Sequence, residues 1–401
     1  MKILSKLIIT PMVYRQKEVI VAALMEQNRI CQLHIAAQEN KGILGNIYIG
    51  KVQSIVKNIH AAFIEIANGV NCYYSMDEKS EIFFTNQKKD KTMKIGDEVL
   101  VQVSREGIKT KLPCVTGNLN FTGRYLVLTS QRKELGFSGK LKKEEKKRIR
   151  AILEDQLPKQ AGLIVRTNCR DADTADILRE LEQLQQQYED LLKKASTRVC
   201  FSLLEESMPD YMQVLQSTYT KNLEEIVTDD KTIFQQIQRY LQCYETKAVP
   251  VRFYEDSLLP LAKLYCLESA ISEGTQERVW LKSGGFLVIQ QTEAFVCIDV
   301  NTGKFSEKKE IQDTFRKINL EAAREIAWQL RLRNLSGIIL IDFINLEKEE
   351  DKKELLQNLQ GYLKQDPVKG TVVDMTPLNI VEVTRKKVRK SLQEELNALE
   401  K

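Results

Sequence analysis

The chain is 401 residues long, which is more than one ordinary hydrophobic core can organise, so we expect two to four domains. Its 43% hydrophobic and 29% charged residues are typical of a globular protein, and no apolar run approaches the roughly 18 residues of a membrane span. The net charge of +5 is modest, but basic residues gather at 140–150 and 384–390.

The N-terminal segment and the cysteines indicate where the protein works. The first twelve residues lack the long apolar core and the cleavage site of a secretory signal, so we expect a cytoplasmic location. The eight cysteines stand 23 or more positions apart, so the chain contains no C-x-x-C pair. Isolated cysteines of a cytosolic protein are usually buried thiols, and we expect that here.

The N-terminal third has the alternating pattern of short strands. Residues 18–25 and 29–36 are predicted strands joined by a turn, and four more follow at 46–56, 61–66, 71–74 and 98–104. From Gly45 on, the short alternating strands predict a small Greek-key barrel of the oligonucleotide-binding class, with the lysine-rich stretch 87–94 as a loop. Phe63 and Tyr73 fall on adjacent strands, where they either stack on bases or belong to the barrel core.

The middle of the chain mixes strands and helices. We predict strands at 123–128 and 162–165, a long helix at 173–196, and a mostly helical segment from 201 to 275 with a break at 249–251. Arg166 and Thr167 directly follow the second strand, where a guanidinium and a hydroxyl could hold a terminal phosphate. The basic run 140–150 includes acids and is interpreted as the solvated face of a helix.

Two acids each follow an apolar strand segment. Asp299 lies near the end of the stretch 284–303, and Asp342 ends the run that begins at Gly337, with a predicted helix between them at about 310–334. A strand, helix, strand order predicts two parallel strands whose carboxyl ends share one sheet edge. Two carboxylates so close repel unless a cation lies between them, and an all-oxygen pair suits magnesium.

Asn301 lies two residues beyond Asp299, on the same face of an extended chain, where it could orient a ligand or a water. The alternative is that Asp299 and Asn301 cap backbone amides in an Asx turn. The two histidines, His34 and His60, are far from these acids in the sequence and are interpreted as surface or packing residues. No phosphate-binding G-x-x-x-x-G-K-[ST] loop is present.

The C-terminal part is predicted to contain a helix at 352–364, a strand at 371–375 and a final basic helix. The run 384–390 carries five cations in six residues, so it either contacts a polyanion or is simply solvated.

Nine segments, taken together and in order, resemble the ribonuclease E/G family. Among them are Gly-Leu-Ile-Val-Arg-Thr at 162–167, Ile-Asp-Val-Asn-Thr-Gly at 298–303 and Asn-Leu-Glu-Ala-Ala at 319–323. The others lie at 45–52, 61–66, 123–128, 279–289, 291–294 and 329–335.

The resemblance implies a magnesium-dependent endoribonuclease that cuts single-stranded RNA, an rRNA precursor or an mRNA, and leaves 5′-phosphate and 3′-hydroxyl ends. It also implies an α+β multidomain fold, in which an RNase H-like subdomain is interrupted by an S1 barrel and a 5′-sensor subdomain and is followed by a DNase I-like catalytic subdomain. The implied boundaries are 1–41 and 201–275 for the RNase H-like parts, 42–118 for S1, 119–200 for the sensor and 276–401 for the catalytic part.

Carried over by motif, the resemblance makes Asp299 and Asp342 the ligands of one Mg²⁺ per active site, with Asn301 as their helper. It makes Phe63, Tyr73 and Lys111 contacts to RNA, and Arg166 with Thr167 the pocket for a 5′-monophosphate.

The sequence departs from the family at several points. Asn345 stands where relatives usually carry a second acid, and Tyr73 stands where phenylalanine is usual. The C-x-x-C zinc link and the small domain after it are missing before the chain stops at Lys401. We therefore expect no structural zinc, and any oligomer is expected not to be zinc-linked. The alternative function is a non-catalytic RNA-binding factor that acts through the S1 barrel and the basic segment.

Overall fold

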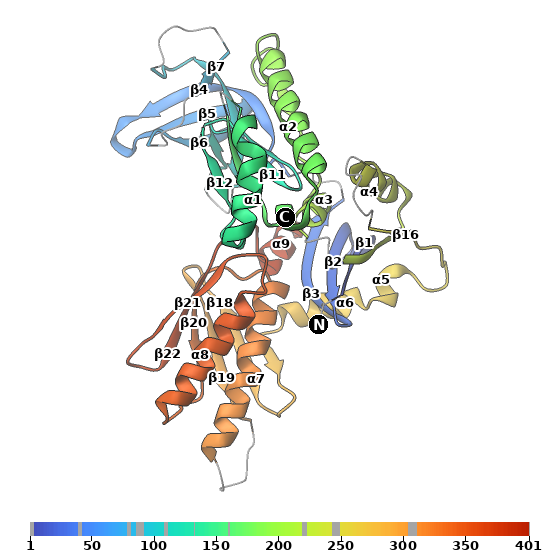
Figure 1. The fold of residues 1–401 in the computed structure, drawn as a ribbon, viewed down its shortest axis with the longest axis vertical. Helices are drawn as coiled ribbons and strands as arrows, with labels where there is room; N and C mark the ends of the chain where they lie inside the picture. Colours follow the sequence, from blue (N-terminus) through green and yellow to red (C-terminus); the bar gives the residue numbers. More distant parts are fainter. Residues whose placement is uncertain are drawn as a thin grey trace. The chain divides into compact units, whose positions relative to one another are not determined.

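The computed structural model describes residues 4–38, 42–77, 82–85, 92–107, 111–131, 133–158, 161–218, 223–242, 249–303 and 311–400. The predicted loop at 87–94 lies mostly outside the described residues. The chain forms two compact units (Figure 1). One, which we call the barrel unit, contains residues 41–220 and 241–248; the other, the two-sheet unit, contains 1–40, 221–240 and 249–401.

A closed five-stranded barrel begins the barrel unit, as the alternating pattern predicted. The strand order is β4-β5-β6-β9-β8, and β8 closes the ring by pairing antiparallel with β4. Short strands β7 and β14 extend it at β8 and β4. The bounds are β4 Ile47–Val56, β5 Ala61–Ala67, β6 Val70–Ser75, β7 Phe83–Phe84, β8 Glu98–Arg105, β9 Cys114–Thr116 and β14 Leu203–Glu205. The closed barrel is consistent with an S1-like fold.

A four-stranded sheet with helices completes the barrel unit. Its order is β10-β11-β13-β12, and the helix predicted at 173–196 is confirmed as α2, whose apolar side packs on this sheet. The bounds are β10 Asn120–Thr122, β11 Leu126–Thr129, β12 Leu135–Phe137, β13 Gly162–Val165, α1 Lys143–Leu153, α2 Thr174–Ala195 and α3 Asp210–Ser217. Helix α1 carries the basic run 140–150 and buries only Ile149 and Leu153, so the solvated-face interpretation is confirmed.

The strand predicted at 123–128 starts only at Leu126. The backbone N–H groups of Arg124, Tyr125 and Leu126 donate to the buried carboxylate of Glu180 on α2, at 2.7 to 2.8 Å. These amides therefore turn toward a side chain instead of a neighbouring strand, which the local sequence does not reveal.

The first sheet of the two-sheet unit has the order β16-β15-β1-β2-β3. Its bounds are β1 Ser5–Tyr14, β2 Lys17–Glu26, β3 Arg29–Ala37, β15 Leu223–Thr228 and β16 Val251–Phe253, accompanied by α4 Lys231–Gln242, α5 Leu261–Leu264 and α6 Leu267–Thr275. The segment 201–275, predicted to be mostly helical, contains the helices α3 to α6, but the prediction missed β15 and β16, which pair parallel, β15 with β1 and β16 with β15. That the sheet is RNase H-like remains a prediction.

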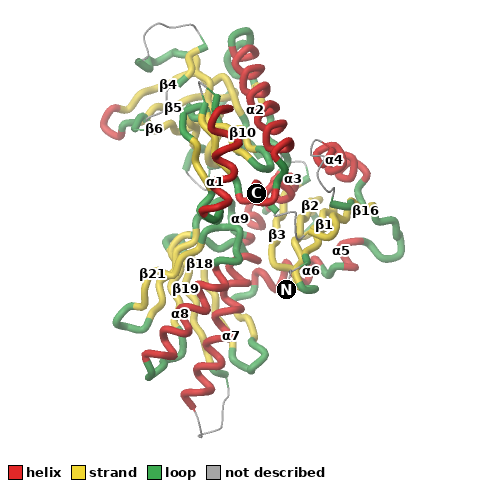
Figure 2. The backbone as a smooth tube through the Cα atoms, in the orientation of Figure 1, coloured by secondary structure: helices red, strands yellow, loops and turns green. Residues whose placement is uncertain are grey.

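The second sheet of this unit has the order β17-β18-β19-β20-β22-β21. Its bounds are β17 Arg278–Trp280, β18 Phe286–Gln291, β19 Phe295–Asn301, β20 Gly337–Asp342, β21 Gly370–Met375 and β22 Ile380–Arg385. The stretch 284–303 is thus a hairpin rather than one strand. Helices α7 (Ile311–Leu332) and α8 (Glu349–Leu363) lie along the sheet and share one core with it (Figure 2).

The sheet side chains that enter this core alternate with side chains on the opposite face, which we call the open face. On β18, β19 and β20 the residues Leu287, Val300 and Ile341 are buried in the core. Their sequence neighbours Asp299 and Asp342 are exposed, as expected for side chains that alternate along a strand.

The predicted final basic helix is wrong. The basic run 384–390 starts on β22, continues in a segment that is not helical, and is followed by α9 (Leu392–Leu399), which carries two acids in its first turn. Arg385 is buried and donates from Nε to Asp366 Oδ2 at 2.7 Å, and Lys387 pairs with Glu394 at 2.9 Å. These two cations therefore serve ion pairs within the chain.

Several thiols are buried, as predicted for isolated cysteines. Burial raises the pKa of Cys31, Cys72 and Cys169 to about 12, which keeps these thiols protonated and unreactive at neutral pH. Cys266, in contrast, is exposed. Among the described residues, no helix is both long enough and apolar enough to cross a membrane.

Candidate active site

Asp299 and Asp342 face each other across two neighbouring strands. Strand β19 pairs parallel with β20, and Asp299 is the register partner of Asp342. Adjacent strands lie about 4.8 Å apart, so the two carboxylates project from the open face side by side. Both are exposed, so water can reach them. The predicted strand, helix, strand unit is confirmed, and α7 is its connecting helix.

Asn301 holds the carboxylate of Asp299 in place. Its Nδ2 donates to Asp299 Oδ2 at 2.7 Å. Strand β19 continues through Asn301, so both side chains project from the same face of a strand and the Asx-turn alternative is wrong.

Two glycines bring another turn close to Asn301. A Cβ on Gly285 would lie 2.7 Å from the carbonyl oxygen of Asn301, which is too short for a real contact. Gly303 has a φ of +69°, in the left-handed region, and a Cβ there would collide with the Gly284 carbonyl. Only glycine lets the turn before β18 approach the end of β19 in this way.

The segment after Asp342 is fixed by a buried asparagine on α7. Asn319 is 0% exposed; its Nδ2 donates to the Ile344 carbonyl at 2.7 Å, and its Oδ1 accepts from the Ile344 N–H at 3.1 Å. A side-chain amide that pairs with both the backbone N–H and the backbone carbonyl of one residue holds the two adjoining peptide units in one position. Asn319 therefore sets the course of the chain just beyond Asp342.

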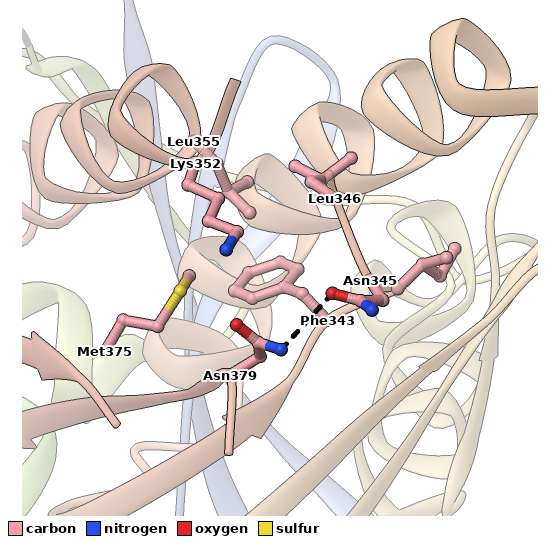
Figure 3. A pocket seen from close by; sticks show the side chains of 8 residues that line it. Phe343, Asn345, Leu346, Lys352, Leu355, Met375 and Asn379 are labelled. Carbon is pink, nitrogen blue, oxygen red and sulfur yellow. Dashed lines mark hydrogen bonds between the residues drawn. The ribbon is translucent and has the colours of Figure 1, made fainter. Parts of the chain in front are cut away.

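A small pocket lies in the same region, beside the carboxyl end of β20 (Figure 3). Asn379 donates from Nδ2 to Asn345 Oδ1 at 3.2 Å at its edge. The pocket is lined by Phe343, Ile344, Asn345, Leu346, Lys352, Leu355, Met375 and Asn379. Asn345, the departure from the family noted in the sequence, thus bonds to a second amide and leaves Asp342 as the acid on this segment.

The donor set suits a hard divalent cation. Magnesium takes one or two carboxylates and completes its octahedron with water, which an exposed pair of neighbouring aspartates permits. Within the described part of the chain, no group of three or more His, Cys, Asp and Glu side chains is placed to hold a metal ion. The residues present fit Mg²⁺ through Asp299 and Asp342.

The two histidines lie in other surroundings. The buried His34 places Nδ1 2.6 Å from Glu395 Oε1, and the exposed His60 lies 3.2 Å from Asp77. Their interpretation as packing and surface residues is confirmed.

On the barrel, Phe63 and Tyr73 lie together. They are register partners on β5 and β6, and their ring centroids are 6.3 Å apart in an edge-on arrangement. Both are half-buried, while their neighbours along the strands, Ala62 and Tyr74, are buried in the barrel core. The barrel-core alternative is therefore wrong for Phe63 and Tyr73. Lys111 is exposed, on the segment that leads into β9, the strand next to Tyr73.

Arg166 and Thr167 lie at the end of β13, also in the barrel unit. The Arg166 Nη1 donates to the Gly123 carbonyl, and the Thr167 and Ser138 hydroxyl oxygens are 2.9 Å apart. Both side chains are half-buried, so each can present part of its surface to a ligand.

Comparison with known proteins shows to which family the chain is similar. The Ribonuclease E/G family matches residues 120–388, more than half of the sequence. Ribonuclease G of Haemophilus influenzae is 31% identical over 384 residues, which are 92% of this chain and 78% of that protein. The chain belongs to the ribonuclease E/G family.

Two further ribonuclease E/G relatives agree. Ribonuclease E of Nostoc sp. is 32% identical over 381 residues, 93% of this chain but 55% of that protein. Ribonuclease G of Escherichia coli is 28% identical over 376 residues, 90% of this chain and 76% of that protein. The resemblance predicted from the motifs is confirmed, and the chain is a nuclease of the hydrolase class.

Sequence reasoning did not find two residues that shape this ribonuclease E/G site, although both belong to the motif at 319–323. Asn319 holds the segment beyond Asp342, as described above. Glu321 accepts from the N–H groups of Lys282 and Ser283, at 2.7 and 3.2 Å, and so holds the turn before β18. The motif marked these positions, but their partners become visible only in the fold.

Proposed function

We propose that this chain is a Mg²⁺-dependent endoribonuclease that hydrolyses single-stranded RNA and leaves a 5′-phosphate and a 3′-hydroxyl. The observation that carries the proposal is the register pairing of Asp299 with Asp342 on the open sheet face. Members of the family generally depend on a divalent metal ion, and the ribonuclease names of the relatives support an endonuclease role. The proposal keeps the cytoplasmic location expected from the sequence.

In this proposal Asp299 and Asp342 hold one Mg²⁺, and Asn301 keeps the Asp299 carboxylate in one orientation. When bound, such a cation supplies Lewis acidity toward the phosphodiester and the attacking water. The water oxygen bonds to phosphorus as the bond from phosphorus to O3′ breaks, and a water proton ends on O3′. These steps give the proposed ends.

The barrel and the sensor residues contribute position rather than chemistry. The half-exposed rings of Phe63 and Tyr73 offer a surface on which unpaired bases stack, and Lys111 offers a cation for the RNA backbone. Arg166 and Thr167 would hold a 5′-monophosphate by charge-assisted hydrogen bonds. For the subdomains we propose the identities that the family resemblance implies, namely RNase H-like, S1, 5′-sensor and DNase I-like.

The deciding experiment is cleavage of a 5′-monophosphorylated, A/U-rich oligonucleotide with Mg²⁺ and after its removal by EDTA. We expect internal cleavage with Mg²⁺ and none after chelation, with 5′-phosphate ends on the downstream product. RNA binding without cleavage under both conditions would instead support the non-catalytic RNA-binding factor.

Replacing Phe63 with alanine should weaken RNA binding by about 1–3 kcal/mol, the contribution of one base stack. Because Phe63 lies outside the barrel core, the melting temperature should change little. Affinity for a single-stranded oligonucleotide and thermal unfolding are measured together. Phe83→Ala, which removes another exposed ring from the barrel unit, is the matched control. A large loss of stability with unchanged affinity of the folded protein would refute the stacking role.

Arg166→Ala should slow cleavage of 5′-monophosphorylated RNA about tenfold or more, since charge-assisted bonds contribute about 1.5–3 kcal/mol. The same RNA with a 5′-hydroxyl offers no charge to hold, so its cleavage rate should hardly change. Arg150→Ala removes an exposed cation of the barrel unit and serves as the control. An equal decrease on both substrates would mean that Arg166 is structural, a role to which its bond to the Gly123 carbonyl contributes.

A further inference from the structure

A pair of aromatic side chains, the exposed Trp280 and the half-buried Phe286, shares the open face with the two aspartates. Trp280 on β17 is 65% exposed, and its ring centroid is 5.2 Å from that of Phe286 on β18, at an angle of 58°. Burial of a tryptophan is among the larger favourable contributions in a protein, so a mostly exposed indole is not explained by the fold of this unit.

The strand register places this pair beside the candidate active site. Trp280 is the partner of Phe286, and Phe286 is in turn the partner of Asn301. Two residues further along each of these strands on the same face, the register partners across the sheet are Arg278, Val288, Asp299 and Asp342. Two strand spacings separate β17 from β19, so the indole starts about 10 Å from Asn301 across the sheet.

A cation accompanies the rings. The guanidinium carbon of Arg278 lies 4.5 Å from the Phe286 ring centroid and 5.8 Å from that of Trp280. Arg278 is exposed, so its charge remains accessible while the guanidinium lies near both rings. Two aromatic faces with a positive charge match a nucleobase and its phosphate better than they match an apolar protein surface.

We propose that Trp280, Phe286 and Arg278 form a base-stacking site for an unpaired nucleotide next to the cleaved phosphodiester. The inference rests on the proposed ribonuclease function and extends it. It adds an RNA contact in the two-sheet unit to those proposed for the barrel unit. The occupant is a base of the single-stranded substrate, because the site is continuous with the aspartate pair on one sheet face. Stacking of this base on the rings would hold the neighbouring phosphate of the RNA in position beside Asp299 and Asp342.

The first test uses intrinsic fluorescence, because the chain has only two tryptophans, Trp280 and Trp328. Trp328 is half-buried on α7, where its Nε1 donates to the Ile30 carbonyl at 3.0 Å. Single-stranded RNA added without Mg²⁺ should quench the wild-type emission. The quenching should be lost in Trp280→Phe while binding is retained. Binding without quenching in the wild type would overturn the proposal.

The second test compares affinities and cleavage. Trp280→Ala should weaken binding about five- to hundredfold and raise KM more than it lowers kcat, whereas Trp280→Phe should recover most of the loss. The matched control is Phe295→Ala, because Phe295 is 38% exposed on the open face but lies at the opposite end of β19. On an oligonucleotide with an abasic nucleotide at the stacked position, the Trp280→Ala defect should disappear.

Other outcomes separate this site from its rivals. Equal losses in Trp280→Ala and Phe295→Ala, or a defect that persists on every abasic substrate, would overturn it. A change in molecular mass by light scattering on Trp280→Ala, with RNA affinity unchanged, would assign the face to a second copy of the chain and also overturn it. Mg²⁺-dependent cleavage without quenching refutes only this site, whereas quenching with no cleavage refutes only the proposed catalysis.

Discussion

Asp299→Asn and Asp342→Asn should each lower the cleavage rate by several orders of magnitude while RNA affinity stays nearly unchanged. Each change removes one negative charge from the carboxylate pair that would hold Mg²⁺, and such a cation, when bound, would stabilise the charge that develops in the transition state. The proposed RNA contacts at Phe63, Tyr73 and Trp280 are not altered. Single-turnover cleavage and equilibrium binding of the same oligonucleotide measure the two effects separately.

The control for this pair is Asp374→Asn, because Asp374 is an exposed acid of the same sheet, on β21. It should keep the wild-type rate and Mg²⁺ dependence. If Asp299→Asn or Asp342→Asn retained a near-normal rate at saturating Mg²⁺, the assignment of the two aspartates as metal ligands would be wrong.

The second large effect is expected at Asn319, a positioning residue that does not face the open side of the sheet. Asn319→Ala leaves the N–H and the carbonyl of Ile344 without their side-chain partner, which should cost about 1–3 kcal/mol of stability. It also releases the segment that follows Asp342. A displacement of about 1 Å at a catalytic group can lower kcat about a hundredfold, and we expect an effect of that size.

Asn358→Ala is the matched control for Asn319, because the Asn358 amide also donates to a backbone carbonyl, that of Glu354 within α8. It should leave kcat unchanged. The positioning role further predicts a split between kinetic constants: kcat falls in Asn319→Ala while KM changes little, at a temperature where the variant is fully folded. A wild-type kcat in the folded variant would show that Asn319 contributes only to stability.

Much of this protein follows from patterns that are local in the sequence. The alternation of apolar and polar residues in the first hundred positions predicted the barrel strands, and the helical period between Asp299 and Asp342 predicted α7. A helix between two apolar strands then requires a parallel crossover, so the meeting of Asp299 with Asp342 could be inferred before the fold was known. Each of these predictions depends only on residues that are close in the sequence or on a single strand–helix–strand connection.

Other features depend on partners that lie far away in the chain. Strands β15 and β16 are short and not strongly patterned, and they become strands only because β1, more than 200 positions earlier, offers its edge to β15. Arg385 in the basic run donates to the buried Asp366, an ion pair within the chain that the cluster of charges in the sequence did not reveal.

The family, the barrel strands and the acid pair could be inferred from the sequence alone, because short-range periodicity and the order of the motifs indicate them. The fold was needed to show that Asn319 holds the chain beyond Asp342 and that Trp280, Phe286 and Arg278 share the face of the aspartates. The physical reason is that strand register and the satisfaction of buried polar groups are set by pairing between distant segments. No local pattern records which residues will be neighbours across a sheet.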